Sequence, residues 1–477
     1  MSGNLKERLE TLSGLVAGDR TTDKAHAFFK KNFKLPGNPF PPSGIADATE
    51  ENPPLRPKMA KDIVDFIETS YRDRQSHSMT VTGEYGTGKT HTLRFIEQVI
   101  NTYMNVGDQS ARAIYVERPR LEANELNRTI LRRLGFDTVR KYIWFAIREV
   151  LSREISGDEE EFRRLRRNLT LPQKRSVGAL GGTPRLWNEE DAPIPAAFTK
   201  VFSEESLNDY RTFLFALEKN GWGREAVRYY LVHCLVTAIG EDISIDLADS
   251  FIALLLARDE KSFSSWESLA SVTKLRAGSD LRAPTFLQFL LRIMQRNGIR
   301  YVYLLLDEFE EVPQGNLLSP RQRQEYLYTI REVFDKIQEG LAVVIAITPG
   351  ALTALTEVAT PLADRNWRTI NLQPIELEDA IKLVQCYFDR ERERSSIKRV
   401  KAGDLRPLSE EILRYILDHL PPNVQKTPRN LIQFLHRLFD YTAQNDIPTI
   451  NQDVVKRLLD DFGAMKPSQP QVHRRRK

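Results

Sequence analysis

Eight consecutive residues combine a flexible backbone with a lysine and a threonine hydroxyl directly after it, which is the chemistry that holds a phosphate. They match the pattern G-x-x-x-x-G-K-[ST] in full and are Gly83, Glu84, Tyr85, Gly86, Thr87, Gly88, Lys89 and Thr90. The glycines let the backbone turn tightly and bring its N–H groups to phosphate oxygens. A helix that starts near Lys89 would add its positive N-terminal end. We predict that Lys89 contacts the β- and γ-phosphates, that Thr90 binds Mg²⁺, and that His91 completes the nucleotide-binding stretch.

A second chemical element is an acidic pair at the end of an apolar run, YVYLLLDE at residues 301–308. Ligand-binding groups of α/β sheets lie at the carboxyl ends of strands. Asp307 would hold Mg²⁺ through water, and Glu308 would polarise an attacking water as a general base. The alternative is a buried strand that runs into an acidic helix start, since Glu310 and Glu311 follow. For the glycine loop, the alternative is a plain turn between a strand and a helix.

These groups need a scaffold, and the apolar runs of the chain predict one. Five runs have the length and β-branched content of strands buried on both faces, at residues 78–83, 112–118, 301–308, 342–348 and 368–375. Helical patterns separate them, for example at residues 91–103 and 321–338. Strands that alternate with helices predict an α/β fold with a parallel sheet.

The spacing of these elements predicts the domains. The second and third strands are far apart, and mostly helical patterns fill the interval, so we expect a helical insertion within a core domain. All-helical patterns also follow the fifth strand. The expected parts are an N-terminal arm (1–54), a core (55–135 and 284–375), the insertion (136–283), a helical lid (376–465) and a basic disordered tail (466–477).

Composition narrows the class of protein. The 477 residues carry a net charge of only +4, so bulk charge does not predict a polyanion binder. Two distant cysteines suggest no disulfide framework, which fits a cytoplasmic compartment. The charged N-terminus lacks a signal core, and no apolar run approaches the roughly 20 residues of a membrane span. The seven histidines show no metal-ligand spacing.

With the loop GEYGTGKT and the DE pair, the chain resembles the AAA+ class of P-loop ATPases. GEYGTGKT is the form common in that class, and an acid pair is typical of it. The resemblance implies a five-stranded parallel core sheet in the order 5-1-4-3-2, binding of ATP with Mg²⁺, and hydrolysis of ATP. It covers roughly residues 50–130 and 284–462.

Further residues acquire roles from this resemblance. Thr348 ends a strand that matches the strand carrying the first sensor residue. Arg429, in Thr427-Pro428-Arg429-Asn430, resembles the arginine of the second sensor, which contacts the γ-phosphate. Arg365 is the first candidate for an arginine finger that reaches a neighbouring subunit, and Arg368 is the second. Each also has an ordinary interpretation: a strand-end hydroxyl for Thr348, a helix-start arginine for Arg429, and a solvated surface pair for Arg365 and Arg368.

Within the class, the small helical domain looks most like that of origin-recognition initiators and of related ATPases of transposition and phage defence. Initiators continue into a winged-helix domain after the lid, and this sequence ends soon after it, so we expect none. The resemblance implies a homo-oligomer and a client that is DNA or a DNA-bound protein complex. The expected function is a motor or switch driven by ATP hydrolysis. The alternative is a nucleotide-gated assembly scaffold or signalling switch with negligible turnover.

Overall fold

The computed structural model describes residues 24–43, 56–104, 110–117, 123–155, 207–219, 224–240, 245–257, 283–310, 337–358, 367–394 and 403–465, with residues 319, 321 and 401. The chain divides into two compact units. The unit that we call the lid unit comprises Met1–Asp65, Val81–Phe95 and Ile370–Lys477. The sheet unit comprises Phe66–Thr80 and Ile96–Thr369.

Five strands form one parallel sheet in the order β2-β3-β4-β1-β5, which confirms the predicted order 5-1-4-3-2. The strands are β1 (His77–Thr82), β2 (Ser110–Glu117), β3 (Ile299–Asp307), β4 (Leu341–Ile347) and β5 (Trp367–Asn371). All seven residues of β4, LAVVIAI, are buried, and β3 is buried at every position but one. Strands that are apolar on both faces require cover on both faces, which explains why these runs do not alternate with polar residues.

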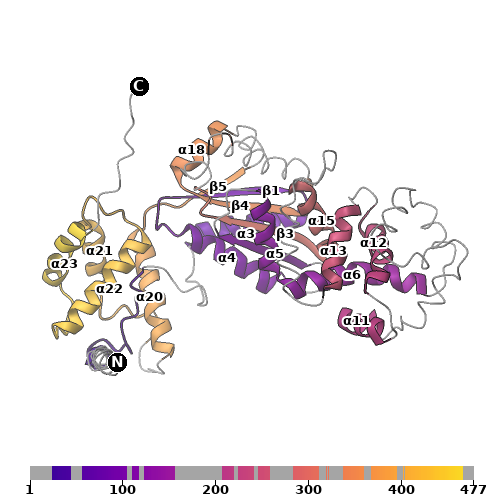
Figure 1. The fold of residues 1–477 in the computed structure, drawn as a ribbon. Coiled ribbons are helices and arrows are strands. Elements are labelled where there is room, and N and C mark those ends of the chain that lie inside the picture. Colours follow the sequence, from indigo (N-terminus) through magenta and orange to yellow (C-terminus); the bar gives the residue numbers. More distant parts are fainter. Residues whose placement is uncertain are drawn as a thin grey trace, which may run out of the picture. The chain divides into compact units, whose positions relative to one another are not determined.

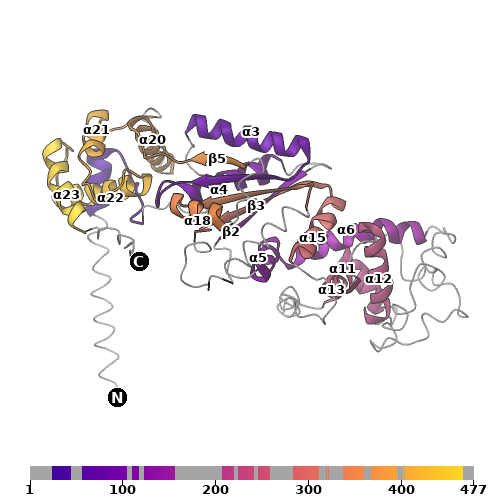
Figure 2. The ribbon, with the colours of Figure 1, turned by 90° about the horizontal axis from the view of Figure 1, so that it is seen from above.

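Helices of the sheet unit cover the central strands (Figures 1 and 2). Helix α3 (Pro57–Asp73) meets β3 through a buried pair of hydroxyls, Ser70 and Tyr303, whose oxygens are 2.9 Å apart. Each of these hydroxyls also lies within hydrogen-bond distance of the Ile67 carbonyl. Helix α15 (Ala283–Arg296) packs on β3, and α5 (Ala123–Leu134) packs on β2. Helix α4 (Lys89–Tyr103) begins at the predicted lysine.

A cluster of four further helices extends the core of the sheet unit (Figure 2). They are α6 (Phe136–Ile155), α11 (Tyr210–Lys219), α12 (Arg224–Ile239) and α13 (Ile245–Leu256), and they lie in the interval that helical patterns fill in the sequence. Buried Arg140 of α6 fastens the end of α13 by donating to the carbonyls of Leu255 (2.8 Å) and Ala257 (3.0 Å).

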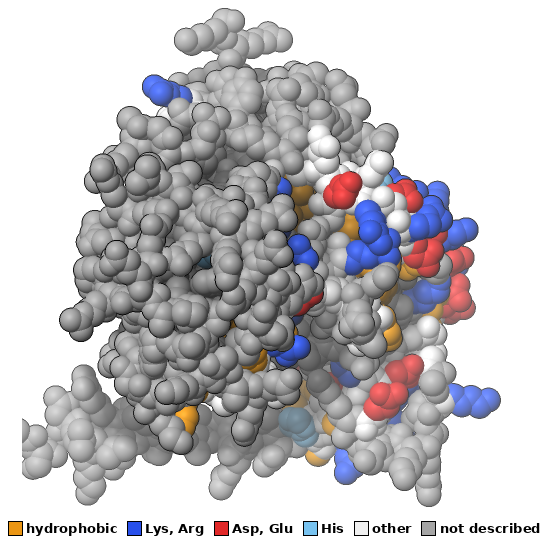
Figure 3. Space-filling view, turned by 90° about the vertical axis from the view of Figure 1, so that its right-hand side faces the viewer, with side chains coloured by type: hydrophobic (Ala, Val, Ile, Leu, Met, Phe, Trp, Pro, Cys, Tyr) orange, Lys and Arg blue, Asp and Glu red, His pale blue; other side chains and the backbone are white. Residues whose placement is uncertain are grey.

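On the face drawn in Figure 3, the described residues present acidic and basic side chains side by side.

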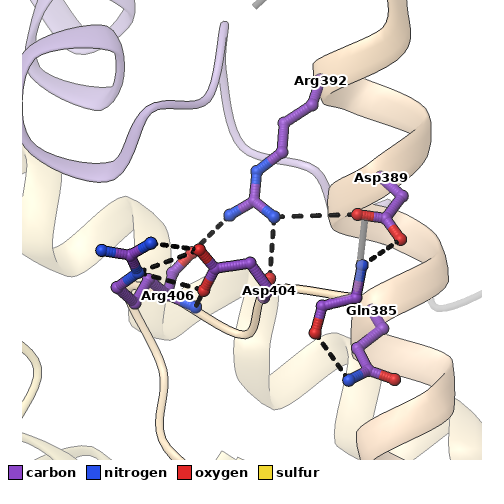
Figure 4. Close-up of polar contacts among 6 residues, drawn as sticks. Gln385, Asp389, Arg392, Asp404 and Arg406 are labelled. Atoms are coloured by element: carbon purple, nitrogen blue, oxygen red, sulfur yellow. Dashed lines mark hydrogen bonds and ion pairs between the residues drawn. The ribbon is translucent and has the colours of Figure 1, made fainter. Parts of the chain in front are cut away.

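Four helices of the lid unit follow β5: α20 (Leu377–Arg394), α21 (Glu410–His419), α22 (Pro428–Gln444) and α23 (Gln452–Met465). A polar network ties the end of α20 to the loop before α21 (Figure 4). Arg392, only 5% exposed, donates to the carbonyls of Asp404 (2.7 Å) and Arg406 (2.6 Å). Asp389 accepts from the Gly403 N–H at 2.8 Å. Two nitrogens of the buried guanidinium therefore donate to backbone carbonyls, which fixes the path of the loop.

The N-terminal arm is part of the lid core. Residues 24–33 are helical and include a π-helix, η1 (Phe29–Phe33), and the proline-rich residues that follow them, 34–43, are not helical. Phe29 and Phe33 pack against Phe439 of α22, with ring centroids 6.2 and 5.4 Å apart. Phe40 contacts the same ring at 5.2 Å. Aromatic rings contribute large buried areas, so the arm supplies a share of the core that the lid helices would otherwise lack.

Polar contacts hold the end of the arm on α22. Nδ1 of His436 lies 2.7 Å from the Phe40 carbonyl, and Nε2 lies 3.1 Å from Oδ2 of Asp440. The carbonyl and the carboxylate are both acceptors, which favours an imidazolium, and the Asn38 amide nitrogen also lies 3.1 Å from Nδ1. Asn38 donates to the other Asp440 oxygen at 2.8 Å. The hydrogen bond with Asp440 raises the pKa of His436, against burial and the nearby charge of Arg437, which lower it.

We expect the arm to loosen as the pH rises. Because the pKa of His436 is higher in the folded protein than the ordinary histidine value of about 6.5, its protonation stabilises the folded state. This stabilisation is fully present below about pH 6.5 and is lost as the pH rises through the pKa of the folded protein. Burial raises the pKa of Asp440, but hydrogen bonds from His436 and Asn38 bring it below its usual value, so it stays charged in this window. The loss should amount to about one hydrogen bond, or about 1 kcal/mol.

Hydrogen exchange of residues 24–43 between pH 5.5 and 8.5, corrected for intrinsic rates, would measure this loosening. In His436→Gln the corrected protection should not vary with pH. Equal pH dependence in both proteins would contradict the role of the imidazolium.

Several predictions concern residues outside the described ranges: the basic tail, most of the helix at 321–338, and Arg365. The limits of the predicted domains stay predictions. Among the described residues, no helix is both long enough and apolar enough to cross a membrane. No group of three or more histidine, cysteine or acidic residues in the described ranges could hold a metal ion.

Candidate functional site

The phosphate loop, residues 83–90, is a tight turn between β1 and α4 in the lid unit. Its first glycine has no room for a side chain: a Cβ on Gly83 would lie 2.6 Å from the Thr87 hydroxyl and 2.9 Å from Leu372 Cβ. The Thr87 hydroxyl donates back to the Glu84 carbonyl at 2.8 Å. A Cβ on Gly88 would instead have no heavy atom within 4 Å. The loop is therefore closely packed at its start and open at Gly88, which leaves space there for a phosphate group.

Lys89 is folded over this loop. Its side chain is 7% exposed, and Nζ donates to the carbonyls of Gly83 (2.9 Å) and Glu84 (3.4 Å). The ring of Tyr85 lies beside the ammonium, with its centroid 5.1 Å from Nζ, while Tyr85 as a whole is 57% exposed. A largely buried ammonium needs acceptors, and here backbone carbonyls supply them. The lysine is thus held where an anionic group in the loop would meet it.

The loop also contacts the start of α22. The backbone N–H of Arg429 donates to the Gly86 carbonyl at 3.3 Å. Thr427 caps the helix, because its hydroxyl accepts from the Asn430 N–H (3.3 Å), and Pro428 follows as the first helical residue. This order, threonine then proline, is typical of helix starts. The predicted second-sensor motif therefore lies directly on the phosphate loop.

Replacing Gly86 with alanine should disrupt this contact. Gly86 has φ +82°, and a Cβ there would lie 3.0 Å from Arg429 Cβ and 3.1 Å from the Thr427 hydroxyl. The left-handed backbone alone costs about 1–2 kcal/mol for a residue with a Cβ. Gly88→Ala is the matched control, since Gly88 has φ +105° but open space around it. In denaturant unfolding, Gly86→Ala should cost more free energy than Gly88→Ala. Equal costs would show that α22 does not restrain the loop.

The acidic pair lies in the sheet unit, at the end of β3. Asp307 is 2% exposed, and its Oδ1 accepts from the Glu308 N–H at 2.9 Å. Its Oδ2 accepts from the Tyr115 hydroxyl at 2.5 Å. Glu308 is half-buried and has φ +51°, an unusual conformation for a residue with a long side chain. Residues held in such conformations cluster at functional sites.

The remaining predicted residues fall in different places. Thr348 is buried directly after β4, and its carbonyl accepts from Leu352 N–H at the start of α18 (Pro349–Val358). Thr90 is exposed and His91 half-buried, both in the first turn of α4. Arg368 is exposed on β5. Because Arg365 lies outside the described residues, the choice between the two finger candidates stays a prediction.

Two contacts were not predicted from the sequence. The hydrogen bond of Tyr115 with Asp307 is one. The set of contacts made by Arg56 is the other. Arg56 donates to the carbonyls of Gln373 (2.9 Å) and Pro374 (3.0 Å) and pairs with Asp379 of α20 at 2.7 Å. Arg56 thereby fixes the chain between β5 and α20. The sequence did not indicate these contacts, because the partners of Arg56 lie more than three hundred residues away along the chain.

Comparisons with known proteins add a structural likeness. Neither a protein-family model nor a curated protein sequence matches this chain. Among solved structures, the Aeropyrum pernix ORC2 protein in ADPNP-ADP complexes is similar, with a TM-score of 0.43 and 11% identity over 88% of this chain and 72% of that chain. Its ADP form has a TM-score of 0.40 and 12% identity over 87% and 71%. Similarity at this level carries no residue-by-residue correspondence.

Proposed function

We propose that this chain is an AAA+ protein that binds ATP with Mg²⁺, hydrolyses it, and acts as a motor or switch on DNA or a DNA-associated protein complex. The observation that carries the proposal is the phosphate loop with Lys89 folded over it and Arg429 at its rim. A cation, open backbone at Gly88 and a helix start at Lys89 together form a site for a polyphosphate.

The residues also fit Mg²⁺. Asp307 is a buried carboxylate that forms no ion pair with a basic side chain among the described residues, so a cation would compensate its charge. Thr90 offers a hydroxyl oxygen at the start of α4. Carboxylate, hydroxyl and water oxygens are the ligands that Mg²⁺ prefers. When bound, the ion would neutralise phosphate charge, and Thr90 and Asp307 would hold it.

The order of the strands supports the role proposed for each of these elements. The loop follows β1, Asp307 ends β3, and only β4 stands between these strands. Carboxyl ends of parallel strands share one edge of a sheet, where α/β proteins bind ligands. We infer that Lys89 contacts the β- and γ-phosphates of a nucleotide bound at the loop.

In the proposed reaction, Glu308 accepts a proton from a water as the water oxygen bonds to the γ-phosphorus. The bond from that phosphorus to the β–γ bridging oxygen breaks, and ADP and phosphate result. Lys89, Arg429 and Arg365 or Arg368 of a neighbouring copy would neutralise the developing charge. Thr348 would sense the γ-phosphate. A finger from another copy requires a homo-oligomer.

The contact of α22 with the loop suggests how hydrolysis could drive motion. Arg429 belongs to a helix whose start depends on the Gly86 carbonyl, so a phosphate that moves the loop would move α22 as well. The client is inferred from the resemblance to initiators and not from the site. Both cysteines are free thiols, which fits the expected cytoplasmic compartment.

Nucleotide binding and turnover of the purified chain test this proposal. We expect ATP binding that tightens with Mg²⁺, and phosphate release that responds to added duplex DNA. Assembly state with ADP or a non-hydrolysable ATP analogue should differ. Absence of nucleotide binding would overturn the proposal. Binding and assembly without turnover would favour the nucleotide-gated scaffold instead.

A further inference from the structure

A buried phenol lies against the carboxylate that we assign to magnesium. Tyr115 of β2 is 2% exposed, and its hydroxyl donates to Oδ2 of Asp307 at 2.5 Å. The parallel register aligns Tyr115 with Leu305 and Glu117 with Asp307, so Tyr115 and Asp307 leave the sheet on the same face, two positions apart. A phenol is long enough to span that diagonal, whereas serine or threonine is too short.

The second oxygen of this carboxylate is held from the opposite side. The Glu308 N–H donates to Oδ1 at 2.9 Å, so the two donors fix both ends of the Asp307 carboxylate. Any rotation of the group breaks at least one of these bonds. Both donors are uncharged, and each oxygen keeps a second lone pair. The carboxylate is therefore oriented while it retains its negative charge and its capacity to accept from a metal-bound water.

Other residues support the phenol itself. The guanidinium carbon of Arg133, on α5, lies 5.8 Å from the centre of the Tyr115 ring, and Arg133 pairs with Glu117 at 3.9 Å. A cation over the ring draws electron density from it and makes the hydroxyl a better donor. The guanidinium of Arg133 is thus a charged neighbour of the Tyr115 ring.

Other buried tyrosines of the sheet form hydrogen bonds with uncharged acceptors, whereas the hydroxyl of Tyr115 donates to a carboxylate. Tyr301 donates to the carbonyls of Gln75 and Leu341, and Tyr303 contacts the Ile67 carbonyl and the Ser70 hydroxyl. Of these three buried tyrosines, Tyr115 alone donates to a carboxylate. Partners of metal-binding side chains typically affect metal affinity 10- to 100-fold.

We propose that Tyr115 is a positioning residue for magnesium, which holds Asp307 in the orientation that the ion requires; this rests on the proposed function. Tyr115→Phe removes only the hydroxyl and keeps the ring in place. Tyr303→Phe is the matched control, because it removes a buried hydroxyl of β3 that contacts the Ile67 carbonyl and Ser70 and not Asp307.

The test is a Mg²⁺ titration of the binding of a fluorescent ATP analogue to the full chain, with a second measurement of binding in EDTA. For Tyr115→Phe we expect the half-saturating Mg²⁺ concentration to rise about 10-fold, the lower end of the effect of such partners, with binding in EDTA unchanged. Tyr303→Phe should match the wild type in both. In an Asp307→Ala background, Tyr115→Phe should have no further effect on the Mg²⁺ dependence.

The outcomes separate this inference from the function on which it rests. Failure of the wild type to bind the nucleotide would overturn both. Mg²⁺-dependent binding that is the same in the wild type and Tyr115→Phe would overturn the positioning role and leave the proposed function intact. A lower unfolding midpoint in Tyr115→Phe, with an unchanged Mg²⁺ titration, would also overturn it, because the hydroxyl would then be merely structural.

Discussion

Replacing Glu308 with glutamine should lower ATP turnover about 100- to 10,000-fold while ATP binding stays close to that of the wild type. Glutamine has the shape of glutamate but cannot accept a proton from the attacking water. The position is already defined by the backbone, since Glu308 has φ +51° and its N–H is bonded to Asp307. Single-turnover phosphate release and equilibrium binding of ATP, measured on the same preparation, would separate the two effects.

Glu310→Gln is the control for this substitution. Glu310 is also buried in the turn after β3, so its replacement tests whether any loss of charge in that turn lowers turnover. We expect Glu310→Gln to keep more activity than Glu308→Gln. Two results would contradict the enzymatic role: equal loss in both variants, or near-zero turnover of wild type and Glu308→Gln while ATP still drives assembly. The second result would support a scaffold.

The sheet could be predicted from the sequence because its signal is local. Runs such as LAVVIAI are apolar at every position, and burial on both faces is the physical reason. The start of α22 could also be predicted, because Thr427 and Pro428 stabilise the beginning of the helix in which they themselves lie. The fifth strand was predicted too long. It ends at Asn371, and Pro374, which has no N–H for a ladder, lies in the segment that Arg56 fastens.

What the sequence did not predict depends on contacts between distant residues. No pattern in the arm indicated the helix at residues 24–33, where Phe29 and Phe33 pack against the ring of Phe439, far along the chain. Tyr115 was identified as part of a strand, and alternation places its side chain on one face. No pattern within β2 indicates that the hydroxyl meets Asp307, because that contact depends on the register of a strand far along the chain.

Lys89→Ala should weaken ATP binding by about 100-fold or more. The ammonium is positioned over the loop by the carbonyls of Gly83 and Glu84, and hydrogen bonds from a charged donor are worth about 1.5–3 kcal/mol each. Two such bonds to phosphate oxygens would be lost, and nothing replaces the charge.

Lys426→Ala is the control for Lys89→Ala, because it removes one positive charge from an exposed site just before α22. It should bind ATP almost as the wild type does if the effect of Lys89 is local and not a matter of net charge. Equilibrium titration with a fluorescent ATP analogue measures both variants, and an unchanged unfolding midpoint would show that Lys89→Ala remains folded. A folded Lys89→Ala protein that still binds ATP tightly would rule out the phosphate-loop assignment, and with it the proposed roles of Thr90, Asp307 and Glu308.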